Sequence, residues 1–203
     1  MGKILKEGRR IALYMGIGDG HINKNSYFLS IRHCLKQKEY LEWKRKLLIE
    51  KGFSCSEIKY VPNNGYGAYE FYTHYNKCFK LIRKILYKNG KKYYNPAVFK
   101  KITPLGLAIW YMDDGSISTD SQRSILTIST CTTREENQKI IDIIKERFQI
   151  SFGQRKMGKN YALICGTREA RKFLKIVEPY IMQVSCMRYK LNVKPISYKQ
   201  NNN

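Results

Sequence analysis

Two acidic residues stand at the ends of two similar apolar segments, and their placement could support chemistry. Asp19 closes the run 10–22 and Asp114 closes the run 104–117, each directly before a glycine. Either ending alone is typical of a C-terminal helix turn. The pair is unusual, because the helix dipole disfavours negative charge at that end. Two carboxylates brought together repel unless a divalent cation lies between them, and that arrangement suits metal-assisted attack of water on a phosphodiester.

The same order of elements follows each run. Strand-like segments rich in β-branched and aromatic residues come next, and each precedes a segment whose apolar residues have helical spacing. A second strand-like stretch and a closing helix complete each copy. The paired segments are 26–32 and 123–129, 38–51 and 134–148, 67–73 and 160–165, and 77–88 and 168–177. The repeat predicts an α+β fold made of two copies of one unit.

The joint between the copies is expected between residues 92 and 103, where Asn95-Pro96 interrupts regular structure. We therefore divide the chain into residues 1–95 and 96–203. Thr103 and Pro104 predict the start of the second run as a cap and a first-turn proline.

Two further local patterns concern helix packing and helix ends. Thr132 with Glu135 predicts a capping box at the start of the segment 134–148. Small residues in both runs predict that the two runs pack closely against each other as helices. These residues are Ala12 and Gly16 in the first run and Gly106 and Ala108 in the second.

The charge of the chain points to a polyanionic partner. The sequence has 38 basic and 16 acidic residues, a net charge of +22 that folding does not require. Nucleic acid, ribosomal RNA included, and a membrane surface fit this charge equally well, but no apolar stretch approaches a membrane span. Six cysteines without CxxC spacing and three histidines give little support for a structural zinc site. Without a recognisable signal peptide, an intracellular protein with reduced cysteines is expected.

Both runs resemble the LAGLIDADG motif of homing endonucleases. Residues 12–20 (ALYMGIGDG) and 107–115 (LAIWYMDDG) occupy the nine motif positions, and the likeness extends over about residues 8–194. The sixth motif position is Ile17 and Met112 instead of an acid. The resemblance implies two αββαββα units related by a pseudo-two-fold axis. These units would pack through the motif helices, and each would carry a saddle-shaped antiparallel sheet.

The same resemblance implies a role for each motif acid. Asp19 and Asp114 would be catalytic metal ligands, and the backbone carbonyls of Gly18 and Asp113 would add further ligands. Mg²⁺ is the implied cofactor, with Mn²⁺ able to substitute.

The resemblance also implies one basic residue per half near the metals. Lys190 matches the closing Met-Arg-Tyr-Lys pattern, and Lys92 is the choice in the first half, with Lys91 in reserve. In so basic a chain, either lysine could equally be an ordinary phosphate contact or a solvated charge.

Strand alternation divides the side chains that could read DNA. In 26–32, Leu29 and Ile31 share one face, and in 123–129 Leu126 and Ile128 do so. The opposite, more polar faces are candidates for contacts with base edges or phosphates. The predicted DNA-binding residues are Lys24, Ser26, Ser30, Arg32, Lys59, Arg123, Thr127, Ser129, Arg155 and Lys156.

The expected function is therefore site-specific cleavage of double-stranded DNA by a monomer, which leaves staggered ends with 3′ overhangs. Its expected location is the cytoplasm of a bacterium, with a phage origin as one option, or an organelle. Two alternatives use the same fold: an intron RNA maturase, and a DNA-binding regulator without catalysis. An intein is disfavoured because no splicing-like segments flank the repeats.

Overall fold

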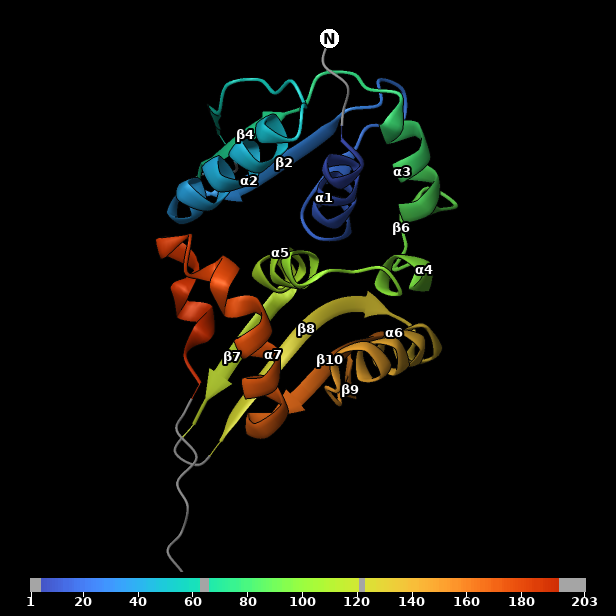
Figure 1. Cartoon of the computed structure of the whole chain (residues 1–203), viewed down its shortest axis with the longest axis vertical. Helices are drawn as coiled ribbons and strands as arrows, with labels where there is room; N and C mark the ends of the chain where they lie inside the picture. Colours follow the sequence, from blue (N-terminus) through green and yellow to red (C-terminus); the bar gives the residue numbers. More distant parts are fainter. Residues whose placement is uncertain (1–4, 63–65, 121–122, 194–203) are drawn as a thin grey trace, which may run out of the picture.

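Two similar units, one above the other along the long axis, make up the computed structural model (Figure 1), which describes residues 5–62, 66–120 and 123–193. The first unit contains α1 (Lys6–Ile17), β1 (His21–Ile22), β2 (Leu29–Cys34), η1 (Leu35–Gln37), α2 (Lys38–Glu50), β3 (Lys59–Val61), β4 (Ala68–Tyr72) and α3 (Cys78–Leu86). The second contains α5 (Pro104–Asp114), β7 (Gly115–Thr119), β8 (Ser124–Thr132), α6 (Arg134–Phe148), β9 (Gly153–Met157), β10 (Asn160–Gly166), α7 (Thr167–Ile181) and η2 (Ser185–Leu191). The predicted order αββαββα is confirmed in both units.

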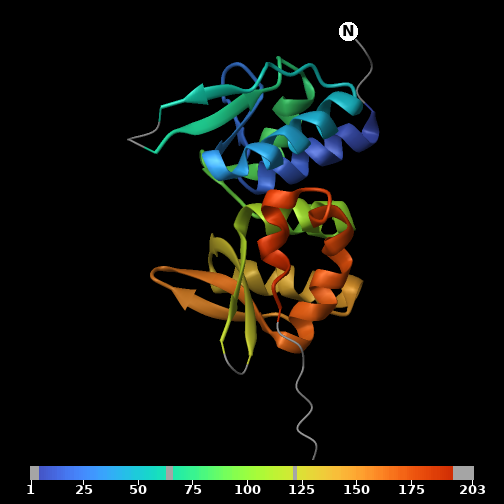
Figure 2. The same ribbon diagram turned by 90° about the vertical axis from the view of Figure 1, so that its left-hand side faces the viewer.

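Each unit has one antiparallel sheet of four strands. The strand orders are β1-β2-β4-β3 and β7-β8-β10-β9, so equivalent strands take equivalent places. Strands β3 and β4 of one sheet and β9 and β10 of the other extend toward the same side of the molecule (Figure 2). The units are joined by β5 (Tyr87–Lys88), β6 (Lys91–Lys92) and α4 (Pro96–Phe99). The division at residues 95 and 96 stays a prediction.

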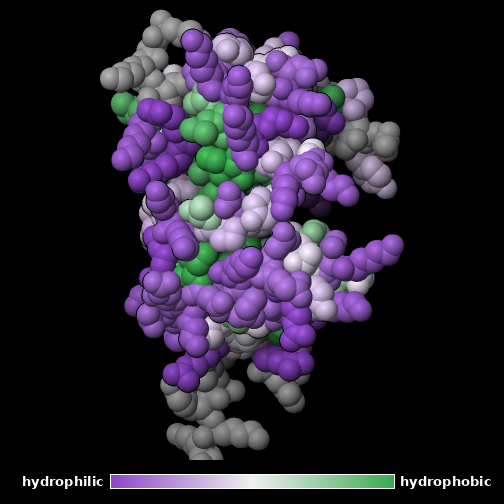
Figure 3. Space-filling model, turned by 90° about the vertical axis from the view of Figure 1, so that its right-hand side faces the viewer, coloured by the Kyte–Doolittle hydropathy of each residue, from purple (hydrophilic) through white to green (hydrophobic). Residues whose placement is uncertain are grey.

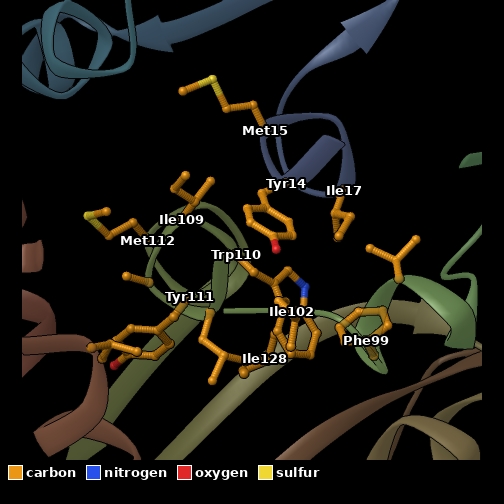
Figure 4. Packing of buried hydrophobic residues seen from close by; sticks show 14 of the residues in the cluster. Tyr14, Met15, Ile17, Phe99, Ile102, Ile109, Trp110, Tyr111, Met112 and Ile128 are labelled. Carbon is orange, nitrogen blue, oxygen red and sulfur yellow. The ribbon is translucent and has the colours of Figure 1, made fainter. Parts of the chain in front are cut away.

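The two motif helices, α1 and α5, lie between the sheets and carry the repeated runs. Gly106 allows their close approach, because a Cβ there would lie 2.9 Å from the Tyr14 ring. Tyr14 also donates a hydrogen bond across the interface to the Lys101 carbonyl at 3.1 Å, and its ring lies beside Trp110 (Figure 4). Gly16 has a different neighbour, since its Cβ would meet Leu86 of α3. The expected small-residue contact between the helices is therefore confirmed at Gly106, whereas Gly16 serves the contact with α3.

The flank that carries α3 and α4 shows an apolar band among hydrophilic side chains (Figure 3). Helix α3 has 9 residues whereas α7 has 15, so α3 offers less cover to its motif helix. A groove of about 840 Å³ results between α1 and α3, with Leu81 and Ile82 in its wall and Arg9 and Arg10 at its edge. No described helix is long and apolar enough to cross a membrane.

Strand β2 begins at Leu29, three residues later than the predicted start at Ser26. The side chain of Asn23 accepts hydrogen bonds from the backbone N–H groups of Asn25 (2.9 Å) and Ser26 (2.8 Å). This turn holds the backbone away from a neighbouring strand. Within the strand, Leu29 and Ile31 are buried and Arg32 is exposed, so the predicted alternation holds there.

The capping box of α6 lies one residue later than predicted. Thr133, not Thr132, accepts a hydrogen bond from the Glu136 backbone N–H at 3.2 Å, and the Thr133 N–H donates to the Glu136 carboxylate at 3.4 Å. Thr132 instead donates to the Glu136 carboxylate from the end of β8. By contrast, the Thr103 cap of α5 is as predicted and accepts from Gly106 N–H.

Thr133→Ala removes the helix cap and is expected to lower the free energy of unfolding by about 1 kcal/mol. Urea denaturation followed by circular dichroism measures this change. Thr132→Ala is the comparison, since a larger loss there would place the cap at the predicted residue after all.

Candidate active site

The ends of the two motif helices bring the predicted catalytic acids to one region. Asp19 follows the end of α1 and its side chain is 42% exposed. Asp114 is the last residue of α5 and is half-buried, and its Oδ2 accepts a hydrogen bond from the Tyr94 hydroxyl at 3.2 Å. The two acids therefore have different surroundings although they occupy equivalent motif positions.

Both carboxyl groups hold their protons more tightly than usual. Partial burial and the neighbouring Asp113 carboxylate raise the pKa of Asp19. Burial, with the charges of Asp113 and Asp19, raises the pKa of Asp114 to about 7. Since three carboxyl groups affect one another, a divalent cation among them would relieve their repulsion. Carboxylate and carbonyl oxygens are also the donors that Mg²⁺ prefers.

The side chain of Asp113 is buried beneath this site with 0% exposure. Its Oδ1 lies 2.5 Å from the Lys44 ammonium and accepts from the Tyr40 hydroxyl at 2.8 Å. Its Oδ2 accepts from the backbone N–H of Asp19 at 3.0 Å. Burial alone would raise the pKa of Asp113, but the Lys44 charge and these hydrogen bonds hold it below its usual value.

His33 joins this network as a neutral ring. Lys44 has only donors, so its 3.1 Å contact makes His33 Nε2 the acceptor, and Nδ1 then carries the proton toward Gln37 Oε1 at 3.1 Å. Burial and the Lys44 charge lower the pKa of His33 to about 3. The 3.6 Å approach of His33 Nδ1 to Asp19 is therefore not an ion pair.

Among the described residues, Asp19, His33 and Asp113 form one group of metal-ligand types within 4.8 Å. The Lys44 ammonium contacts two of the three, His33 and Asp113, and so supplies positive charge that a metal would otherwise bring. Sequence reasoning identified neither Lys44 nor His33. A signal existed, because Lys44 falls at helical spacing between the buried Leu41 and Leu48 of α2.

The two predicted lysines lie at the ends of the motif helices of their own halves. Lys92 donates to the carbonyl of Gly18 and, at 3.0 Å, to that of Gly20. Lys190 is 5% exposed and donates to three carbonyls at the end of α5. These are Met112, Tyr111 at 3.2 Å and Gly115 at 2.8 Å.

Burial weakens the hold of both lysines on their protons. It lowers the pKa of Lys92, and it lowers the pKa of Lys190 to about 8, although the three nearby acids oppose the effect. The carbonyl of Gly18, predicted as a metal ligand, is thus also the acceptor of Lys92. Lys91 is exposed and lies opposite Lys88 in the backbone register of the β5–β6 hairpin.

The predicted DNA-binding residues lie on the sheets and the loops that join their strands. Lys24 and Ser26 are in the β1–β2 turn, Ser30 and Arg32 in β2, Lys59 in β3, Arg123 before β8, Thr127 and Ser129 in β8, and Arg155 and Lys156 in β9. Three of them have a protein partner or are buried. The Arg32 guanidinium pairs with Glu70 of β4 at 2.7 Å, the Arg123 guanidinium lies 3.7 Å from the Asp120 carboxylate, and Thr127 is only 7% exposed.

The LAGLIDADG DNA endonuclease family matches residues 13–173. The chain belongs to this family. The match covers the C-terminal part of α1, all of α5 and both sheets, so the resemblance seen in the sequence is confirmed.

Three curated relatives are similar to the chain. Protein RecA of Mycobacterium shimoidei is 28% identical over 193 residues, which cover 86% of this chain and 44% of that protein. Cytochrome b mRNA maturase bI2 of Debaryomyces hansenii is 27% identical over 161 residues, 75% of this chain and 60% of that one. A probable intron-encoded DNA endonuclease 3 of Mycosarcoma maydis is 28% identical over 130 residues, which cover 61% of this chain and 93% of that protein. The chain spans less than half the length of the RecA relative.

Solved structures share the fold. The homing endonuclease I-WcaI, bound to its DNA recognition sequence, matches with a TM-score of 0.79 and 21% identity over 96% of this chain and 90% of that one. I-DmoI in complex with DNA and Mn matches with a TM-score of 0.51 and 12% identity, over 84% of this chain and 96% of that one. The predicted homing endonuclease fold is therefore confirmed.

Proposed function

We propose that this protein is a site-specific endonuclease that hydrolyses both strands of double-stranded DNA with the help of a divalent cation. The observation that carries the proposal is the meeting of Asp19 and Asp114 beside two lysines, at the ends of paired motif helices. The net charge of +22 supports a polyanionic substrate. I-WcaI and I-DmoI, which share the fold, were solved bound to DNA.

Asp19 and Asp114 would hold Mg²⁺, or Mn²⁺ in its place, with the backbone carbonyls of Gly18 and Asp113 as further ligands. The raised pKa of each acid supports this assignment, because a cation favours the charged form of both. A bound cation would polarise the scissile phosphate and make a coordinated water more acidic.

Lys92 and Lys190 would steady the ends of the motif helices and place positive charge beside the phosphate. The exposed polar faces of the two sheets would contact the major groove on either side of the cut, through the residues assigned above other than the buried Thr127. Staggered ends with 3′ overhangs, a monomeric enzyme and an intracellular location, bacterial, phage-encoded or organellar, belong to the same proposal.

A second candidate function is RNA splicing as an intron maturase, which the D. hansenii relative favours. Retention of Asp19 and Asp114 favours cleavage, since a maturase or a DNA-binding regulator has no need of them.

A cleavage screen on a randomised plasmid library tests the proposed function. With Mg²⁺ or Mn²⁺ we expect linearisation at one sequence, and with EDTA or Ca²⁺ binding without cutting. Binding without cutting in every cation would overturn the endonuclease proposal, and RNA binding would then be measured.

A further inference from the structure

The residues just before the two motif acids differ between the halves. Asp19 and Asp114 are equivalent motif positions, so the preceding residues, Gly18 and Asp113, are equivalent too. A Cβ at Gly18 would overlap the Asp113 side chain, with its Cγ 2.6 Å away. The carboxylate of the second half therefore fills the space that a side chain of the first half would need.

The charge partner of Asp113 also comes from the first half. Lys44 of α2 is fully buried, and its ammonium contacts Asp113 Oδ1 at 2.5 Å and His33 Nε2 at 3.1 Å. The ammonium also lies 4.3 Å from the centre of the Tyr40 ring. One carboxylate from α5 is thus fixed at one oxygen by α2 and is bonded at the other to the Asp19 backbone.

Helix α6, which the structure describes in full, holds no such ion pair in the second half. The buried residues of α6, the helix equivalent to α2, are Asn137 and four isoleucines, so α6 buries no cation. The buried face of α6 therefore carries no charge. A buried ion pair is seldom more stabilising than well-packed apolar residues, because both charges lose their hydration. Stability alone therefore does not account for Lys44 and Asp113.

We propose that Lys44 and Asp113 form a one-sided positioning clamp that holds the Asp19 backbone from the opposite half. The inference rests on the proposed function and deepens it, because the clamp makes the two acids unequal. Asp19 would keep its place only while the Asp113 side chain accepts its N–H bond. Asp114 has a separate support in the Tyr94 hydroxyl. Cleavage of the DNA strand that Asp19 serves would then depend on the clamp, and cleavage of the other strand would not.

Two matched double variants test the hydrogen bond without leaving a buried charge unpaired. Lys44→Met with Asp113→Ala removes both charges and the acceptor for Asp19 N–H. Lys44→Met with Asp113→Asn removes the same charges but keeps an acceptor. Nicking of each strand is measured on a plasmid that carries the recognition site. The strand that Asp19 serves is the one whose nicking falls further in Asp19→Asn.

In the alanine double variant we expect nicking of the Asp19 strand to fall at least about tenfold, with less than about threefold change on the other strand. The asparagine double variant should recover most of the loss. Thr133→Ala, a destabilising change in α6, should give no strand bias.

Amide hydrogen exchange of Asp19, measured by NMR, gives a readout that needs no cleavage. The clamp predicts faster exchange in the alanine double variant than in the asparagine one. Equal exchange, or equal slowing of both strands, would overturn the clamp. If the wild type cuts no DNA, the proposed function fails, and the clamp is judged by the exchange alone.

Discussion

Asp114→Asn is expected to abolish cleavage and yet to make the protein more stable at pH 8. The loss should be at least about 10³-fold, because the substitution removes the charge of a proposed metal ligand. The gain in stability follows from the raised pKa of Asp114, about 7 against 3.8 for an unperturbed group. At pH 8 the folded protein holds an unfavourable buried charge, which asparagine lacks while it can still accept from Tyr94.

The sign of this effect follows from linkage. A carboxyl group with a raised folded pKa favours the folded state at low pH, and this stability is lost as pH rises from about 4 to about 7. Each pKa unit corresponds to about 1.4 kcal/mol, so the variant should gain up to about 4 kcal/mol at pH 8 and almost nothing at pH 4. Urea denaturation in EDTA at both pH values measures the difference.

Asp19→Asn is the matched control for this prediction. It should also lose cleavage, but its side chain is 42% exposed, so stability should change by about 0.5 kcal/mol or less. An Asp114→Asn protein that is less stable than wild type at pH 8 would show that the charged form is not penalised in the fold.

The rate of cleavage should follow a bell-shaped dependence on pH with a narrow maximum between about 7 and 8. Below about pH 7 Asp114 becomes protonated and loses the charge that would attract a cation. The value of kcat/KM should therefore fall about tenfold per pH unit. Above about pH 8 Lys190 loses its charge, and Lys92, whose pKa is also lowered, adds to the decline. Strand nicking at low Mg²⁺ from pH 5.5 to 9.5 measures the profile.

Two changes separate the limbs of this profile. More Mg²⁺ should move the acid limb to lower pH, because the cation competes with the proton for Asp114. The Lys190→Met variant should cut more slowly at every pH and should lose the part of the alkaline limb that Lys190 causes. A flat profile over the whole range would separate both residues from the chemistry.

The repeated pattern of the sequence predicts the two units. It also predicts that Asp19 and Asp114 lie in one region. Helical and strand periodicity are local, and two copies of one pattern imply similar packing. The boundaries of elements differ from the predicted ones where single side chains decide them. The Asn23 turn delays β2, and Thr133 rather than Thr132 caps α6, because each depends on one hydrogen bond that spacing does not reveal.

The sequence does not predict the network around Asp113, and the reason is different. Lys44 and Asp113 are 69 positions apart and meet across the two halves. The spacing of Lys44 from Leu41 and Leu48 is a signal for the apolar face of α2, but this spacing does not say which charge the lysine meets. The space at Gly18 that admits Asp113 exists only once the helices have packed.

The contact between Lys44 and Asp113 also limits how this chain can be rebuilt from parts. A chimera that keeps residues 1–95 and takes its second half from another endonuclease would retain the buried ammonium. Its foreign helix would need an acid directly before the motif Asp-Gly, or the ammonium would have no counter-charge. The reverse chimera would place Asp113 against a first half that must offer glycine at position 18 and a buried cation. The two halves of this chain are therefore matched to each other. One half can be replaced only if residues 18, 44 and 113 remain compatible.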